Sequence, residues 1–68
     1  MKLSARNILT GKIVDVKKGT TTAHVRIAVG DAVITSSITN EAVDELGLKV
    51  GMMASAVIKS SDVIIAVD

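Results

Sequence analysis

Two short polar segments of this 68-residue sequence hold residue types that bind a small anion. Ser4-Ala5-Arg6-Asn7 supplies a hydroxyl, a guanidinium and an amide, and Lys59-Ser60-Ser61-Asp62 supplies an ammonium group and two hydroxyls. Positive charge together with neutral hydroxyl and loop N–H donors is the chemistry that a dianion requires. Thr39 adds a third hydroxyl where a short helix is predicted to begin. Because each segment alone is more typical of a polar lead-in or turn, we expect a site only where the two segments meet, within one chain or between chains.

Groups for acid–base or nucleophilic catalysis are scarce. The single imidazole, His24, alternates with Thr22 and Arg26 along a polar strand face, and local spacing places no carboxylate beside it. Asp44 and Glu45 lie together on a short predicted helix, where a solvated surface is the simpler interpretation. We therefore predict that the protein is not an enzyme.

The composition excludes several kinds of site. With no Cys and one His, neither a disulfide, a thiolate zinc site nor a multi-histidine metal site can form within one chain. The absence of Phe, Tyr and Trp and the net charge of +1 argue against binding to nucleic acid by stacking or bulk electrostatics. No apolar run approaches the roughly 18 residues of a membrane helix, and the first residues lack the apolar core of a secretory signal. We expect a cytoplasmic protein with neither a membrane nor a nucleic-acid partner.

The aliphatic content is high for so short a chain. Hydrophobic residues make up 49% of it, none is aromatic, and ten Val, eight Ile and six Thr are β-branched. A domain of about 60 residues buries only about 60% of the surface that its unfolded chain exposes. Such small domains usually need disulfides, a metal or oligomerisation. Because disulfides are excluded and metal ligands are few, we predict a homo-oligomer.

The spacing of apolar residues and glycines predicts the order βββαββ. Strands are expected at residues 8–18, 20–29, 32–38, 52–59 and 63–67, with a helix at 41–46. Five short strands with a helix after the third is the order of a small OB-type barrel, so we predict an all-β fold in a single domain over residues 1–68. Several strands are apolar on both faces, as at Ile13-Val14, Val33-Ile34 and Val63-Ile64-Ile65. Since one face of a monomer would meet water, the second face is a candidate subunit interface.

Local signals bound the predicted helix. Thr39 or Asn40 can cap its N-terminus. Gly47 can end it in the left-handed conformation that glycine adopts readily. We expect Val43 and Leu46 to face the core.

The polar segments belong to a longer pattern that covers essentially the whole chain. The pattern comprises Ser4-Ala5-Arg6-Asn7, Leu9, Gly11, Lys12, Ile38-Thr39, Val43, Glu45-Leu46-Gly47-Leu48 and Ala56-Val57-Ile58-Lys59-Ser60-Ser61-Asp62-Val63. It resembles the molbindins, small molybdate- and tungstate-binding proteins. The same module occurs in the effector domains of molybdate-responsive regulators and in some oxyanion transporter ATPases. A lone S-A-R-N motif would be weak, but the other elements at matching separations make the resemblance specific.

This resemblance implies a fold, an assembly and a set of binding residues. The implied subunit is an OB-like five-stranded barrel, assembled as a hexamer (a trimer of dimers) with strands exchanged between subunits and oxyanion sites at the interfaces. The matching binding residues are Ser4, Ala5, Arg6, Thr39, Lys59 and Ser60. Ala42 departs from relatives that carry Ser three residues after the position of Thr39, so one side-chain donor is absent here. No cofactor is implied besides the ligand, and no side chain is expected to coordinate the metal of that ligand directly.

We therefore predict reversible binding of molybdate or tungstate at subunit interfaces, for intracellular storage or homeostasis. Arg6 and Lys59 would offset the charge of the anion, and hydroxyls and backbone N–H groups would donate hydrogen bonds. Two alternatives remain open, namely an OB-type oligonucleotide-binding module and an oxyanion-sensing regulatory unit that acts on a separate partner protein. The side chains do not separate molybdate from tungstate, because both are tetrahedral dianions of nearly equal size.

Overall fold

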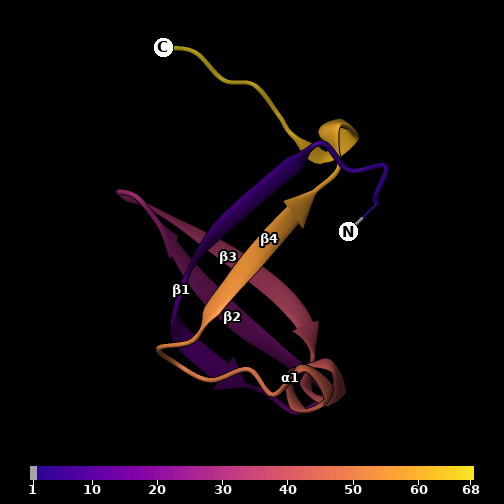
Figure 1. Cartoon of the computed structure of the whole chain (residues 1–68), viewed down its shortest axis with the longest axis vertical. Coiled ribbons are helices and arrows are strands. Elements are labelled where there is room, and N and C mark those ends of the chain that lie inside the picture. Colours follow the sequence, from indigo (N-terminus) through magenta and orange to yellow (C-terminus); the bar gives the residue numbers. More distant parts are fainter. Residues whose placement is uncertain (1) are drawn as a thin grey trace.

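A single curled β-sheet forms most of the computed structural model, which describes residues 2–68. Four strands, β1 (Asn7–Lys18), β2 (Thr22–Val29), β3 (Ala32–Thr39) and β4 (Met53–Ile58), lie in the order β3-β2-β1-β4, with all pairings antiparallel (Figure 1). The helix α1 (Asn40–Leu46) follows β3, and the 3₁₀ turn η1 (Ser60–Asp62) follows β4. The sheet curls into a half-open barrel with one short helix, which confirms the predicted all-β, OB-like class but not the predicted count of five strands.

The strand β1 pairs with both of its neighbours because it is long and bends. Its first half, from Asn7 to Lys12, pairs with β4, and its second half pairs with β2, with an irregularity in register between Ile13 and Asp15. Where β1 crosses β2, a Cβ atom on Gly11 would clash with the carbonyl group of Ala28. Only glycine tolerates so close an approach of two backbones, so Gly11 allows the sheet to curl.

The inner face of the curled sheet carries the hydrophobic core. The buried core side chains are Ile13, Ala23, Val25, Ile27 and Val43. The strand β2 alternates cleanly, with His24 and Arg26 exposed on its outer face. The core is small, and apolar side chains remain exposed on the outer face, including those of Val14 and Val33. The outer face therefore has the apolar character expected of a subunit interface.

The helix α1 begins and ends at the predicted caps. The Oγ1 atom of Thr39 accepts a hydrogen bond from the backbone N–H of Ala42 at 3.0 Å. Gly47 follows the helix with φ 63°. These contacts satisfy backbone groups that the helix itself leaves unpaired.

The prediction for Leu46 was wrong. Val43 is only 3% exposed, as expected of a core residue, but Leu46 is 65% exposed. Leu48, which follows the left-handed turn, packs against the core instead, and its N–H donates to the carbonyl oxygen of Val43 at 3.1 Å. The chain reversal after α1 therefore places Leu48, and not Leu46, inward.

Two strands are shorter than predicted. The strand β2 begins at Thr22 and not at residue 20, because the N–H of Gly19 donates to the carbonyl oxygen of Thr22 at 2.7 Å and closes the turn. The strand β4 covers Met53–Ile58 within the predicted range 52–59. In contrast, β1 and β3 each extend one residue beyond their predicted ranges, to Asn7 and to Thr39.

The fifth strand predicted at residues 63–67 is not present in the single chain. This segment runs away from the sheet (Figure 1), and Ile64, Ile65 and Val67 are 91%, 82% and 91% exposed. A strand forms only where a neighbouring strand pairs with its N–H and C=O groups, and this segment has left the sheet after η1. We call residues 63–67 the C-terminal tail.

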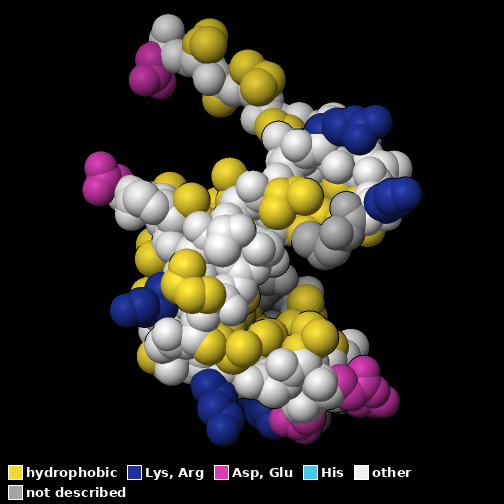
Figure 2. All heavy atoms as spheres, viewed as in Figure 1, with side chains coloured by type: hydrophobic (Ala, Val, Ile, Leu, Met, Phe, Trp, Pro, Cys, Tyr) yellow, Lys and Arg dark blue, Asp and Glu magenta, His cyan; other side chains and the backbone are white. Residues whose placement is uncertain are grey.

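A hollow of about 490 Å³ opens between β3 and β4, where the barrel is not closed. Its walls include residues 34–36 and 38 of β3 and 53–58 of β4, and its floor includes the core residues Ile13, Val25 and Ile27. Yellow hydrophobic side chains are visible in the hollowed part of the surface (Figure 2). We call this hollow the open groove; in a closed five-stranded barrel, the remaining strand would fill it.

Candidate functional site

Antiparallel pairing of β1 with β4 brings the two polar segments together. Asn7 at the start of β1 lies opposite Ile58 at the end of β4, and the Nδ2 atom of Asn7 donates to the carbonyl oxygen of Ile58 at 3.1 Å. Ser4, Ala5 and Arg6 come directly before this pair, and Lys59 and Ser60 follow it directly. Both segments therefore leave the sheet at the same end (Figure 1). We call these five residues the basic cradle.

The basic cradle is open to solvent in the single chain. Ser4, Arg6, Lys59 and Ser60 are exposed, and only Ala5 is partly buried. Lys59 is extended, with φ −66° and ψ 143°, and its carbonyl oxygen accepts the N–H of Asp62 at 2.9 Å, which forms η1. Local hydrogen bonds thus hold the backbone of the Lys59 segment, while the exposed side chains of the cradle are accessible to an anion.

The two cations of the basic cradle carry unpaired charge. Among residues 2–68, the structure contains one ion pair, which joins Lys18 to Asp44. Arg6 and Lys59 therefore have no carboxylate partner within these residues. Dark blue basic side chains are visible at this end of the molecule (Figure 2). A dianion could therefore approach both charges without displacing a carboxylate, but solvent would screen an anion held on one open surface. Strong binding needs a second surface that covers the cradle.

Thr39 lies at the other end of the sheet from the basic cradle. Pairing of β2 with β3 places Thr39 opposite Thr22, beside the Lys18 end of β1, whereas the cradle adjoins the Asn7 end. In Figure 1, α1 lies at the lower end of a molecule that extends 35 Å along its longest axis, and η1 lies in the upper half beside the start of β1. Because a small oxyanion cannot bridge these ends, a single chain does not bring Thr39 to Arg6 and Lys59.

The Thr39 hydroxyl nevertheless keeps a proton that it can donate. Its oxygen already accepts the N–H of Ala42, so its own proton remains available to an acceptor. Ala42 itself offers only this backbone N–H, which the Thr39 oxygen uses. The N-terminus of α1 therefore presents one side-chain donor at this position.

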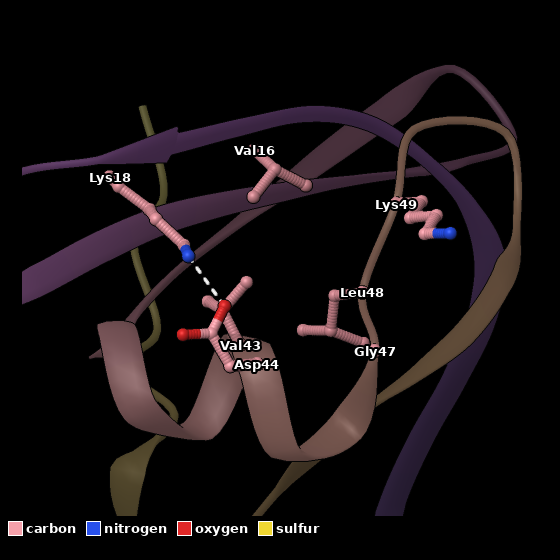
Figure 3. A pocket seen from close by; sticks show the side chains of 7 residues that line it. All are labelled: Val16, Lys18, Val43, Asp44, Gly47, Leu48 and Lys49. Atoms are coloured by element: carbon pink, nitrogen blue, oxygen red, sulfur yellow. Dashed lines mark hydrogen bonds and ion pairs between the residues drawn. The ribbon is translucent and has the colours of Figure 1, made fainter.

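A second hollow, of about 520 Å³, lies between α1 and β1 (Figure 3). The Lys18 ammonium group donates to the Asp44 carboxylate across it, and the Lys49 side chain lies apart from this pair (Figure 3). An anion entering here would meet the Asp44 carboxylate and compete with it for Lys18. The arrangement favours a structural role for the ion pair, which joins α1 to β1.

Asn7 was counted among the polar groups of the S-A-R-N segment, but not among the expected binding residues. Within residues 2–68 its side chain makes no hydrogen bond to a cradle residue, but it joins the two strand ends from which the cradle residues extend. The amide directly before the strand predicted at residues 8–18 was the available signal. Asn7 therefore fixes the ends of β1 and β4 relative to each other, next to the basic cradle.

Residues 3–65 match the family model of the TOBE domain. The chain belongs to the molbindin branch of this family. Molybdenum-pterin-binding protein 1 of Clostridium pasteurianum is 52% identical over 66 residues, which cover 96% of this chain and 97% of the relative. As a molbindin, the chain shares the curled sheet with relatives of the same size.

Two solved structures are similar to this molbindin. MopII from Clostridium pasteurianum in an apo form has a TM-score of 0.90 and 48% sequence identity, and the match covers 97% of this chain and 100% of MopII. ModG, a cytoplasmic molybdate-binding protein crystallised with molybdate bound, has a TM-score of 0.89 and 54% identity. The match covers 94% of this chain but only 46% of ModG.

The described residues contain neither a membrane-spanning helix nor a cluster of metal-ligating side chains. None of the helices in residues 2–68 has the length and apolar character needed to cross a membrane. Within the same residues, no three or more His, Cys, Asp or Glu side chains are grouped to hold a metal ion.

Proposed function

We propose that this chain reversibly binds molybdate or tungstate as an intact oxyanion, for storage or homeostasis of the anion in the cytoplasm. The observation that supports this proposal is the pairing of Asn7 with Ile58, which brings the segments that carry Arg6 and Lys59 to the same end of the sheet. Neither cation has a carboxylate partner in residues 2–68, and Ser4 and Ser60 add hydroxyls to the same two segments. The names of its relatives, which describe molybdenum-pterin-binding and molybdate-binding proteins, support it. The ligand undergoes no covalent change, so the protein is a binding protein and not an enzyme.

The charges and donors of the basic cradle match the needs of a tetrahedral dianion. The two cations offset two negative charges, and the hydroxyls and nearby backbone N–H groups donate to the four oxygens. Each hydrogen bond to a charged group contributes about 1.5–3 kcal/mol when it is shielded from water. Sulfate has the same charge and shape, so discrimination against it depends on the size of an enclosed cavity.

We infer that a second copy of the chain encloses this cavity. The basic cradle is open on one side, and Thr39 lies too far away to act on the anion bound by its own chain. A neighbouring subunit can supply both the cover and the Thr39 hydroxyl. The site is then an interface site, and bound anion stabilises the assembly because it binds only the assembled form.

Strand exchange explains how the copies associate. Within residues 2–68, no strand fills the open groove, and the apolar C-terminal tail pairs with no strand. The free edges of β3 and β4 offer unpaired backbone groups to an added strand. Insertion of the tail of one subunit into the open groove of another would complete the five-stranded barrel. We propose a homo-oligomer built on this exchange, with a hexamer, a trimer of dimers, as its expected form.

Calorimetric titration with tungstate, molybdate and sulfate tests the proposed function. We expect saturable heats for tungstate and molybdate and much weaker binding of sulfate, with the oligomer mass measured by light scattering in the same buffer. Equal weak heats for all three anions would refute selective oxyanion binding. A monomeric protein that still binds tungstate with full affinity would refute the interface site.

A further inference from the structure

Asn40 joins the start of α1 to the turn that connects β1 and β2. Its backbone N–H donates to the carbonyl oxygen of Thr21, and its side-chain Nδ2 donates to the carbonyl oxygen of Gly19, both at 2.9 Å. The turn is itself closed by the 2.7 Å hydrogen bond from the Gly19 N–H to Thr22. Asn40, the first residue of α1, is therefore held by the closed turn between β1 and β2 as well as by its chain connection to β3.

This connection lies directly beside Thr39, the distant donor of the proposed site. The direction of the Thr39 hydroxyl depends on where the first turn of α1 lies, because its oxygen accepts the N–H of Ala42 in that turn. Asn40 fixes the same turn relative to the sheet. We propose that Asn40 is a positioning residue, which holds the Thr39 hydroxyl in the orientation needed to donate to the anion; this inference rests on the proposed function.

The other half of the Asn40 amide supports a role in geometry rather than in stability. Its Oδ1 atom is buried and accepts no hydrogen bond within residues 2–68. A buried acceptor without a partner destabilises a fold, and an apolar side chain at this position would avoid that loss. Reversing the amide would place its oxygen against the carbonyl oxygen of Gly19, so the single hydrogen bond from Nδ2 determines its orientation. The unsatisfied Oδ1 offsets what this bond contributes to stability.

A second link between α1 and β1 provides a matched control. The Lys18 ammonium group pairs with Asp44, which lies further along α1, and both side chains are largely exposed at 46% and 66%. Asp44→Asn breaks this link but leaves both Asn40 hydrogen bonds and the Thr39 cap in place. Because it also removes a negative charge, it cannot weaken anion binding through electrostatics.

A double-mutant cycle on the assembled protein tests the proposal. Tungstate affinity is measured by calorimetry for the unaltered protein, Asn40→Ala, Thr39→Ala and the double variant. We expect Asn40→Ala to weaken binding about three- to tenfold, the range for partial loss of one positioned donor. In the Thr39→Ala background, Asn40→Ala should cause no further loss, and Asp44→Asn should bind as tightly as the unaltered protein.

Each result of the cycle decides between positioning and a general structural role. Light scattering and thermal unfolding are recorded for every variant, since a purely structural role would lower the Tm without coupling to Thr39. Unchanged affinity in Asn40→Ala, or an equal loss with and without the Thr39 hydroxyl, would overturn the proposal. If Asn40→Ala does not assemble, Asn40→Asp replaces it, because its carboxylate removes the Nδ2 donor yet suits a helix N-terminus. The charge of the introduced carboxylate affects tungstate binding both with and without the Thr39 hydroxyl. The comparison therefore uses only the coupling energy between the two substitutions.

The same titrations separate this proposal from the proposed function. If the unaltered protein gives no heat with tungstate, the proposed function fails and the role of Asn40 fails with it. If the unaltered protein binds and Asn40→Ala binds equally well, only the positioning role fails.

Discussion

Replacement of Ile65 by Ala tests whether the C-terminal tail completes the barrel of a neighbouring subunit. Along an extended tail, successive side chains point to opposite faces, so Val63, Ile65 and Val67 share one face and Ile64 and Ala66 share the other. The face with three β-branched side chains is the better match to the apolar open groove. In the single chain Ile65 is 82% exposed, so the substitution should change the stability of an isolated monomer by no more than about 0.5 kcal/mol.

The expected effect on the assembly is much larger. Removing a buried Ile side chain down to Ala costs about 2–5 kcal/mol at each site. A twofold dimer with mutual exchange contains the substitution twice. The loss is then at least about 4 kcal/mol per dimer, and since each 1.4 kcal/mol is tenfold in affinity, association weakens roughly a thousandfold.

The assay is the concentration dependence of mass by light scattering or analytical ultracentrifugation. Ile64→Ala is the matched control, because it removes the same side chain from the adjacent residue, which is 91% exposed in the single chain. We expect Ile65→Ala to dissociate at far higher concentrations than Ile64→Ala. Unaltered assembly in both variants would show that the tail does not enter the groove, and equal losses would refute the assigned face.

Three further predictions concern the cradle, the strand crossing and the cap of α1. Lys59→Ala should lose tungstate binding by at least about tenfold, because one charge-assisted hydrogen bond is removed; calorimetry with the assembled variant checks this, and full affinity would remove Lys59 from the site. Gly11→Ala should lower the free energy of unfolding by about 3 kcal/mol in urea titrations, since its Cβ would clash with the carbonyl group of Ala28; an unchanged midpoint would refute that close approach. Ala42→Ser should tighten tungstate binding by about tenfold, the effect of one added net hydrogen bond; weaker or equal binding in calorimetry would show that residue 42 does not face the anion.

Features set by neighbouring residues in the chain could be predicted from the sequence. Thr39 and Gly47 bound α1 because cap chemistry depends on the side chain or backbone freedom of one residue. The alternation of exposed and buried side chains along β2 follows from the two-residue repeat of a β-strand. The prediction for Leu46 failed because periodicity along a helix does not show where the chain goes after it, and the turn at Gly47 brings Leu48 to the core instead.

The candidate site was predictable in its chemistry but not in its geometry. Residue types alone suggested Arg6 and Lys59 as candidate partners for an anion, which stays a prediction. Their meeting depends on the register that pairs Asn7 with Ile58, which composition does not encode. The pairings of β1 with β2 and of β2 with β3 place Thr39 beside the other end of β1, away from them. A set of residues that resembles one site in the sequence is therefore divided between two ends of the folded sheet.

The C-terminal tail shows why a correct strand pattern can give the wrong strand count. The β-branched residues of 63–67 favour an extended backbone, and that preference belongs to the segment itself. Pairing, however, requires a neighbour, and after η1 the single chain directs Ile64, Ile65 and Val67 into solvent. The open groove lacks a strand in the same way that the tail lacks a partner, because no strand of the same chain within residues 2–68 covers its apolar floor. If the tail fills the groove of another copy, the five-stranded count is correct for the assembled barrel, and the aliphatic excess of this short chain is buried between subunits.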